Sequence, residues 1–506
     1  MPSTPPELTH LGIRELADLV RRHAVSASEV SRSHLARIEA ADAALGAFVE
    51  VGRDAALCEA QRADAATASG RAVGPLHGVP IALKDIFAVR GLATTNGSLG
   101  APAHPSRDST VAHRLREAGA ILVGKLTTSE YSCGSPYLLR RPQNPWHRDH
   151  VPGGSSAGAG IAVSARLVPG AIGGDTGGSV RIPASFCGVL GLRPTAGLVP
   201  TSGVTPLAPG IDVPGPLTRT SADAEVLLRT MARPGGGTAI GTARSISLVG
   251  SPPADRLDPV VANAVERVAR EGAEVLGVHL RVVSPERLHR AWAGAWVLIY
   301  ARALSVHLEL LRAHFDRLSR PLIWKLCAAA ALSQRDRDAA KRIRAEAVDF
   351  LSTTVADGSL IIMPTMAFTA NRVDARYRGE DTMTWTAPAS LAGLPAVTLP
   401  AARNSSGLPI GVQMIAAANT DLELLDLAGR LEMEKIVGDL GVPADIGDAS
   451  TGSSLVPAEE PPAIPVTAAQ VREVRLAARR MGLPAVDEAL ATGAARSLQA
   501  VRLVLY

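Results

Sequence analysis

Apolar positions along this chain follow two periods, one typical of buried strands and one typical of helices. Short segments that are apolar, or that alternate apolar and polar residues, predict strands at residues 79–83, 121–123, 168–172, 245–249, 278–283, 360–363, 396–399 and 410–415. Segments with helical spacing separate many of these runs, and alternating strands and helices form sheets covered by helices. The pattern therefore predicts an α/β protein with a mixed, mostly parallel β-sheet flanked by α-helices.

Capping residues place several helix boundaries. Ser26 and Glu29 form a capping box ahead of an apolar face, and Asp108 is the expected N-cap of a helix that stops at Gly119. Further helices are expected at residues 53–67, 156–165, 179–185, 259–274 and 421–432. Helices thus connect most of the predicted strands.

Composition divides the chain into three parts. Residues 1–436 carry the predicted strands and are expected to form the main domain, with a helical insert at about 286–355 packed on the sheet. Residues 437–465 are rich in Pro, Ser, Gly and acidic side chains, which is typical of a linker. Residues 466–506 predict a helical hairpin that is too small to fold alone, so it must dock on the main domain or on a partner.

Charge and hydropathy exclude some classes of function. The 506 residues carry a net charge of +4, and basic and acidic side chains are interleaved. The sequence therefore gives no sign of a basic surface that would bind nucleic acid. The apolar stretches 291–306 and 321–332 are interrupted by Arg302 and Lys325 and are too short to cross a membrane. The polar start lacks the pattern of a secretory signal. We therefore expect a cytoplasmic protein without membrane contact.

Metal and cofactor sites are not expected. The four cysteines are widely scattered, without the pairing or spacing of a zinc site, which favours reduced and mostly buried thiols. The histidines have no accompanying carboxylate cluster, and no lysine follows the glycine-rich loops as it would in a phosphate-binding loop. The sequence thus predicts no cofactor and no metal.

Two glycine-rich loops and one upstream lysine carry the chemical signal. The loops cover residues 153–158 and 173–179, and Lys84 ends an apolar run. Glycine lets backbone N–H groups turn toward a developing negative charge, and a serine beside such a loop can attack a carbonyl. A lysine can serve as the base only if burial or a nearby positive charge lowers its pKa. Lys84 can meet this condition, so the segments together predict a serine hydrolase with a lysine base.

Other interpretations of these segments remain open at this point. Residues 154–158 also match the G-x-S-x-G elbow of α/β-hydrolases, which would make Ser156 the nucleophile. That elbow directly follows a strand, whereas residues 147–152 contain two histidines and a proline and form a poor strand. Taken singly, each loop could be an ordinary turn and Lys84 an exposed strand-end lysine. Their combination favours the catalytic interpretation.

A series of longer motifs gives these segments a family context. The motifs lie, in order, at residues 76–85, 124–130, 152–156, 174–183, 191–195, 391–396 and 407–413. In sequence and order they resemble the amidase signature family, over roughly residues 10–434. The resemblance implies the amidase signature fold and hydrolysis of a carboxylic amide to a carboxylate and an amine or ammonia.

The family's catalytic residues can be transferred to matching positions. The resemblance implies that Ser179 is the nucleophile that forms the acyl-enzyme. It implies that Ser155, held by a cis peptide bond, relays protons between Ser179 and the base Lys84.

The resemblance also implies a set of supporting groups. Four backbone N–H groups are expected to form the oxyanion hole, those of Thr176, Gly177, Gly178 and Ser179. Three side chains are expected to brace the loops, those of Asp175, Arg181 and Ser156. One departure is Ala157, where the family usually continues its first loop with glycine; alanine can still occupy the first turn of a helix.

Substrate and partner are less constrained. A small-molecule amide is the expected substrate, with an amidotransferase subunit that passes ammonia to an acceptor, or a non-catalytic binding module, as alternatives. The C-terminal helices could hold a homo-oligomer together or bind a small partner. Pocket walls are expected from residues 286–355 and 364–385, where the candidate substrate contacts are Arg372, Arg376, Tyr377, Arg378 and Trp385.

Overall fold

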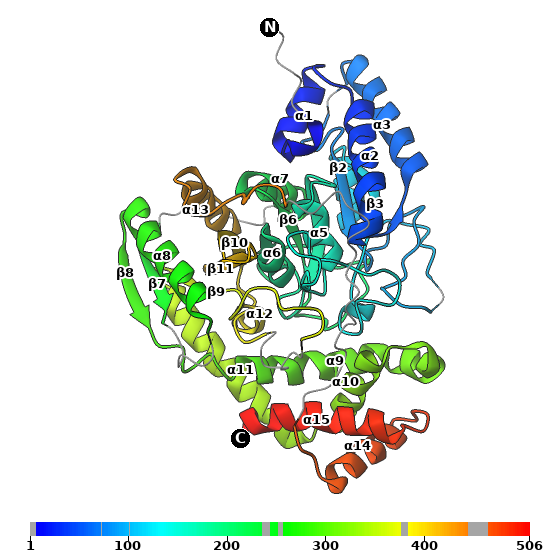
Figure 1. Cartoon of the computed structure of the whole chain (residues 1–506), viewed down its shortest axis with the longest axis vertical. Coiled ribbons are helices and arrows are strands. Elements are labelled where there is room, and N and C mark those ends of the chain that lie inside the picture. The colour runs from blue at the N-terminus through cyan, green and yellow to red at the C-terminus, as the bar shows by residue number, and fades with distance from the viewer. Residues whose placement is uncertain are drawn as a thin grey trace.

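An eleven-stranded sheet runs through the protein (Figure 1). The computed structural model describes residues 7–71, 73–100, 102–234, 243–250, 257–375, 383–443 and 464–506. In these residues the strand order is β1-β3-β2-β4-β6-β5-β10-β11-β9-β7-β8. The strands are β1 Phe48–Val51, β2 Pro80–Lys84, β3 Ile121–Leu126, β4 Gly170–Asp175, β5 Leu190–Arg193, β6 Val213–Thr218, β7 Ser245–Val249, β8 His279–Val283, β9 Leu360–Pro364, β10 Ala396–Arg403 and β11 Pro409–Ile415.

Helices flank this sheet. The α-helices are α1 Ile13–Arg21, α2 Ala27–Leu45, α3 Arg53–Ala68, α4 Thr110–Glu117, α5 Ala157–Ser164, α6 Arg181–Cys187, α7 Ser221–Met231, α8 Pro259–Leu276, α9 Ala291–His314, α10 Arg320–Ala330, α11 Gln334–Val355, α12 Ala387–Ala392, α13 Asp421–Met433, α14 Ala468–Arg480 and α15 Glu488–Leu505. Short 3-10 helices are η1 Leu8–His10, η2 Glu130–Ser132 and η3 Phe315–Arg317. The prediction of a mixed sheet flanked by helices is confirmed.

Strand directions differ between the ends and the centre of the sheet. Strands β3, β2 and β4 are parallel neighbours, and so are β9, β7 and β8. Between these two groups, each neighbouring pair in the series β4, β6, β5, β10, β11 and β9 is antiparallel. The edge strand β1 also pairs antiparallel with β3. The expectation of mostly parallel strands was therefore wrong for the centre. Parallel neighbours need a crossover connection, whereas β10 and β11 form a hairpin. Strands β5 and β6, which the apolar runs did not reveal, complete the antiparallel centre.

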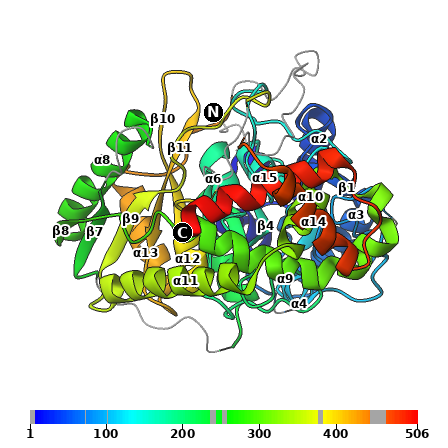
Figure 2. The same cartoon turned by 90° about the horizontal axis from the view of Figure 1, so that it is seen from below.

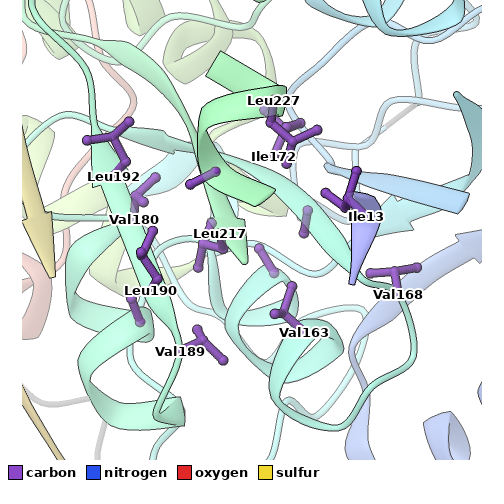
Figure 3. Packing of buried hydrophobic residues seen from close by; sticks show 14 of the residues in the cluster. Ile13, Val163, Val168, Ile172, Val180, Val189, Leu190, Leu192, Leu217 and Leu227 are labelled. Atoms are coloured by element: carbon purple, nitrogen blue, oxygen red, sulfur yellow. The ribbon is translucent and has the colours of Figure 1, made fainter. Parts of the chain in front are cut away.

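The packing around β4, β5 and β6 fixes the middle of the protein (Figure 3). Ile172 of β4, Leu190 and Leu192 of β5, and Leu217 of β6 are fully buried in one cluster with Val163 of α5. Helices α5 and α6 pack against each other, so both loops that precede them are held on a rigid base. Since β2 and β4 are parallel neighbours, their carboxyl ends emerge at the same edge of the sheet.

Helices α9, α10 and α11 lie near α12, α14 and α15 (Figure 1). Their buried side chains form a second apolar cluster. The segment Ala291–Arg317, 27 residues long, would reach across a membrane by length and composition, with 56% of its most apolar window buried inside the protein. The sequence-based estimate of its length was too short, because the helix continues past Arg302. It packs against α10, α11 and α12, so its apolar surface serves as core.

The C-terminal helices α14 and α15 pack on this helical layer, and α15 lies across α10 and α9 (Figure 2). A capping box starts α14, with the Thr467 side chain accepting from the Gln470 N–H. Gly482 directly follows the C-cap of α14 and has φ +66°. Most of the predicted linker, residues 444–463, lies outside the described residues.

One predicted cap differs by a residue. The N-cap of α4 is Ser109, whose Oγ accepts from the Ala112 N–H, and not Asp108. The Asp108 carboxylate is engaged elsewhere, because it accepts from the Arg90 N–H at 2.6 Å and pairs with Arg116 Nε at 3.2 Å. The carboxylate therefore fixes a neighbouring turn while the hydroxyl starts the helix.

Candidate active site

Lys84 ends strand β2 in a fully buried position beside the first serine loop. Its side chain is 0% exposed, and Nζ donates to Ser155 Oγ at 2.6 Å. Burial lowers the pKa of Lys84 to about 7, and the more distant carboxylates of Asp212 and Asp175 oppose this shift only in part. The amine is thus neutral in a large fraction of molecules at neutral pH.

The loop that carries Ser155 has an unusual backbone. Gly153 has φ +79°, and the peptide bond between Gly154 and Ser155 is cis. Helix α5 begins at Ala157, which is fully buried, so alanine does occupy a first helical turn as expected. At Gly158, by contrast, an added Cβ would lie 2.3 Å from the Ala47 carbonyl oxygen, so position 158 does require glycine.

Ser156 supports the two loops and does not face the pocket. Its hydroxyl, fully buried, both accepts from the Gly174 N–H and donates to the Gly174 carbonyl oxygen, at 3.3 Å each. No strand leads directly into residues 154–158 in the described structure. Both observations contradict the α/β-hydrolase elbow with Ser156 as nucleophile.

Asp175 holds the second loop, residues 173–179, in place through hydrogen bonds. This buried carboxylate accepts from the N–H groups of Gly178 and Val180 and from both Arg181 and Arg193. Although burial alone would raise the pKa of Asp175, the two guanidinium groups hold it well below its usual range. The turn between β4 and α6 is therefore held by charge-assisted hydrogen bonds.

Arg181 and Arg193 extend this network to β11, to helix α12 and to the turn before β6. Arg181 also donates to Gln413 Oε1 and Ser390 Oγ, both at 2.9 Å. Arg193 donates to the carbonyl oxygens of Asp175 at 2.7 Å and of Ile211 at 2.9 Å. These contacts are of the kind expected for Asp175 and Arg181, whereas Arg193, in the motif at residues 191–195, had no assigned role.

The four expected oxyanion donors do not all face the same way. Thr176, Gly177 and Ser179 line the pocket. The Gly178 N–H instead donates to Asp175 Oδ1 at 3.0 Å, which removes it from the expected set of donors. Gly178 has φ +130°, and a Cβ there would meet the Thr386 side chain, so this turn needs glycine.

Ser155 and Ser179 open into one pocket of about 380 Å³. The whole chain has only 5 Trp, 5 Tyr and 6 Phe residues. Six of them line this pocket, namely Tyr137, Phe186, Trp292, Trp296, Tyr300 and Trp324. Lys325 is the one cationic side chain in the described lining, which includes no Asp or Glu. The walls are therefore predominantly apolar and aromatic.

A buried glutamate holds the loop 129–135 against this pocket. Glu130 Oε1 accepts from Ser98 Oγ at 2.8 Å, and Oε2 accepts from the Ser319 N–H at 2.9 Å and from its Oγ at 2.5 Å. Ser319 is the N-cap of α10, so this carboxylate connects the pocket loop to the helical layer. Cys133 in the same loop lines the pocket, and burial raises the pKa of its thiol to about 12.

Some candidate contacts do not reach the pocket. Arg372 is exposed and pairs with Asp374 at 3.1 Å, and Trp385 packs in the second apolar cluster. Arg376, Tyr377 and Arg378 lie outside the described residues. In the described parts of the chain no three His, Cys, Asp or Glu side chains gather as a metal site would require.

Comparison with known proteins places this geometry in a family. The amidase family model matches residues 29–425, which is most of the chain. The chain belongs to the amidase family. The resemblance inferred from its motifs is thereby confirmed.

Two kinds of amidase-family relatives are similar to this chain. The A subunit of glutamyl-tRNA(Gln) amidotransferase from Methylococcus capsulatus is 33% identical over 468 residues, covering 83% of this chain and 96% of that protein. Its counterpart from Myxococcus xanthus is 34% identical over 482 residues, covering 85% and 98%. Among solved structures, a substrate complex of 6-aminohexanoate cyclic dimer hydrolase matches with a TM-score of 0.75 at 27% identity, covering 87% and 100%. One hydrolase and two amidotransferase subunits are thus similar to this chain.

Proposed function

We propose that this protein is an amidase that hydrolyses a carboxylic amide with a bulky apolar or aromatic substituent. The observation that carries the proposal is the 2.6 Å contact between the buried Lys84 and Ser155, at the edge of an aromatic pocket that Ser155 shares with Ser179. A lysine with a pKa of about 7 can accept a proton at neutral pH.

The proposed mechanism assigns one task to each group. In the neutral amine the contact reverses, so that the Ser155 O–H donates to the lone pair of Lys84 Nζ. Ser155 then accepts the proton of Ser179 as Ser179 Oγ attacks the amide carbonyl, and the N–H groups of Thr176, Gly177 and Ser179 bind the oxyanion. The relay returns the proton to the leaving amine, and water hydrolyses the acyl-enzyme.

The lining of the pocket supports an apolar substrate. A glutamine substrate carries an ammonium and a carboxylate, and burying either charge without a partner is costly. The described lining offers Lys325 as a cation and no carboxylate to pair with an ammonium. Aromatic walls instead favour aryl or alkyl groups, through burial and ring packing.

A substrate screen tests the proposal. Purified protein is incubated with aliphatic, arylalkyl and anilide amides, with the matching esters as controls, and carboxylate and amine release are both measured. We expect turnover of aryl or arylalkyl amides without any added protein. Release of neither product from any amide, by folded protein, would contradict the proposal.

A second candidate function is an amidotransferase subunit, which the names of the relatives from Methylococcus capsulatus and Myxococcus xanthus support. Such a protein would release ammonia from glutamine or asparagine and deliver it to an acceptor with the help of a partner. Glutamine turnover that exceeds that of aryl amides, and that rises on addition of a partner, would favour this function over the first.

A further inference from the structure

The last helix of the chain forms part of the wall of the catalytic pocket. Ser497, Ala500 and Val501 of α15 line the same pocket as Ser155 and Ser179. Their spacing of three and four places them on one face of the helix. The family match ends at residue 425, so this wall comes from outside the region that the amidase family shares.

A network of charges fixes α15 in position. Arg502 donates to both carboxylate oxygens of Glu473 in α14, at 2.9 and 3.0 Å, and to Asp336 Oδ2 in α11 at 3.0 Å. Tyr506 donates from its hydroxyl to Asp336 Oδ1 at 2.9 Å. Asp336 is 1% exposed, so these contacts set the rotation of the helix at its carboxyl end.

Apolar contacts hold the rest of α15 against the helical layer. Leu490, Ala494, Leu498 and Leu505 are buried in the cluster that α9 and α10 also form. The helix is thus a docked structural element. Its pocket-facing side chains have a defined position relative to the catalytic loops.

The pocket-facing residues of α15 are small, unlike those that line the pocket from α9 and α10. Trp292, Trp296 and Trp324 supply large side chains from these two helices, while Ser497 and Ala500 supply a hydroxymethyl and a methyl group. A larger side chain at either position of α15 would take up part of the 380 Å³ volume. Volume at these two positions is therefore available to a substrate.

We propose that α15 sets the length of substrate that the pocket accepts, with Ser497 and Ala500 as specificity-determining residues. This inference rests on the proposed function and deepens it. The substrate class is an amide whose aromatic or long alkyl group extends from the scissile bond to α15. A short amide reaches Ser179 without contacting this helix.

The test is a ladder of amides from propionamide to 4-phenylbutyramide, with a parallel ladder lengthened on the amine side. The variants are Ala500→Phe and, in case that protein does not fold, Ser497→Leu. Leu503→Phe is the matched control, since Leu503 lies on the same helix with 63% of its surface exposed. Thermal melting confirms that each variant is folded.

We expect Ala500→Phe to lower kcat/KM for the longest amide of one ladder at least about ten-fold relative to propionamide, the range that pocket contacts give. Leu503→Phe leaves this ratio unchanged. An equal effect of Ala500→Phe on short and long amides, or the same change of ratio in the control, would overturn the inference. A purely structural role of α15 would move all substrates together.

Binding separates this inference from the proposed function. In a Ser179→Ala background, quenching of the tryptophan fluorescence that arises in part from Trp292, Trp296 and Trp324 reports amide affinity without turnover. If affinity grows with substrate length and Ala500→Phe removes this growth, the role of α15 in setting substrate length is supported, even if the wild-type protein hydrolyses none of the amides. Affinity independent of length in the wild-type pocket would refute it.

Discussion

Lys84 Nζ and Ser155 Oγ are 2.6 Å apart, with the lysine fully buried, at the edge where β2 and β4 both end. Two separate features of the chain create this contact. The apolar run of β2 carries the lysine into the interior, and the buried helix α5 holds the serine loop. Burial in turn lowers the pKa of the lysine, so position and reactivity have the same cause.

The first prediction concerns the pH dependence of turnover. Since the proposed base is neutral Lys84 with a pKa of about 7, kcat/KM should rise about ten-fold per pH unit below 7 and level off above it. Arginine stays protonated throughout this range, so Lys84→Arg should lose at least about a hundred-fold in activity. Steady-state kinetics from pH 5 to 10 measure both effects. A wild-type profile without a step near pH 7 would count against the lysine base.

The second prediction concerns the stability cost of burying Lys84. Its pKa is lower in the folded than in the unfolded protein, so between about pH 7 and 10 the unfolded state binds more protons and wild-type stability rises with pH. The variant Lys84→Met has no amine at this position, so its stability lacks this pH dependence. Its advantage in unfolding free energy should be several kcal/mol at pH 7, at about 1.4 kcal/mol per pKa unit, and should shrink toward pH 10.

Urea unfolding of both proteins at several pH values measures this difference. Changes that the two proteins share cancel in the comparison, which leaves the titration of Lys84. An advantage that stays constant from pH 7 to 10 would mean that the lysine keeps an ordinary pKa in the folded protein.

Sequence patterns predicted the positions of strands and of the two glycine-rich serine loops for definable reasons. Buried strands are marked by apolar runs, and β9, which covers its predicted run 360–363, is buried at every residue. The tight turn at Gly178 needs glycine, because φ is +130° and Thr386 packs against it. Such requirements act on a few neighbouring residues, so they are visible in the sequence.

Relationships between distant segments were not visible in the same way. Arg193 at the end of β5 and Arg181 at the start of α6 both pair with Asp175, although they belong to different elements. The tryptophans of α9 and α10 and the small residues of α15 meet at the pocket only through packing of the helices. The antiparallel centre also depends on how the strands pair, which apolar runs alone do not specify. These features required the folded structure.

The third prediction tests the support below the second loop. Replacement of Asp175 by Asn would leave two buried guanidinium groups without a carboxylate, which typically destabilises a protein by about 3–5 kcal/mol. Turnover should fall as well, because the Gly178 and Val180 N–H groups lose a charged acceptor. Asp338→Asn, in an exposed ion pair, is the control and should change neither quantity measurably. Unchanged unfolding of Asp175→Asn would show that the network is dispensable.

The last prediction separates the tasks of the serines. A fluorophosphonate reacts with an activated nucleophilic serine, and Ser179 lines the pocket whereas Ser156 is fully buried with its hydroxyl bonded to Gly174. Ser179→Ala should therefore abolish labelling. Ser156→Ala should retain labelling while losing about 1 kcal/mol of stability through its hydrogen bonds. Ser155→Ala should label much more slowly, because Ser179 then lacks its relay to Lys84. Mass spectrometry of the labelled peptides identifies the modified residue, and a label on Ser156 in the wild-type protein would refute the assignment of Ser179 as nucleophile.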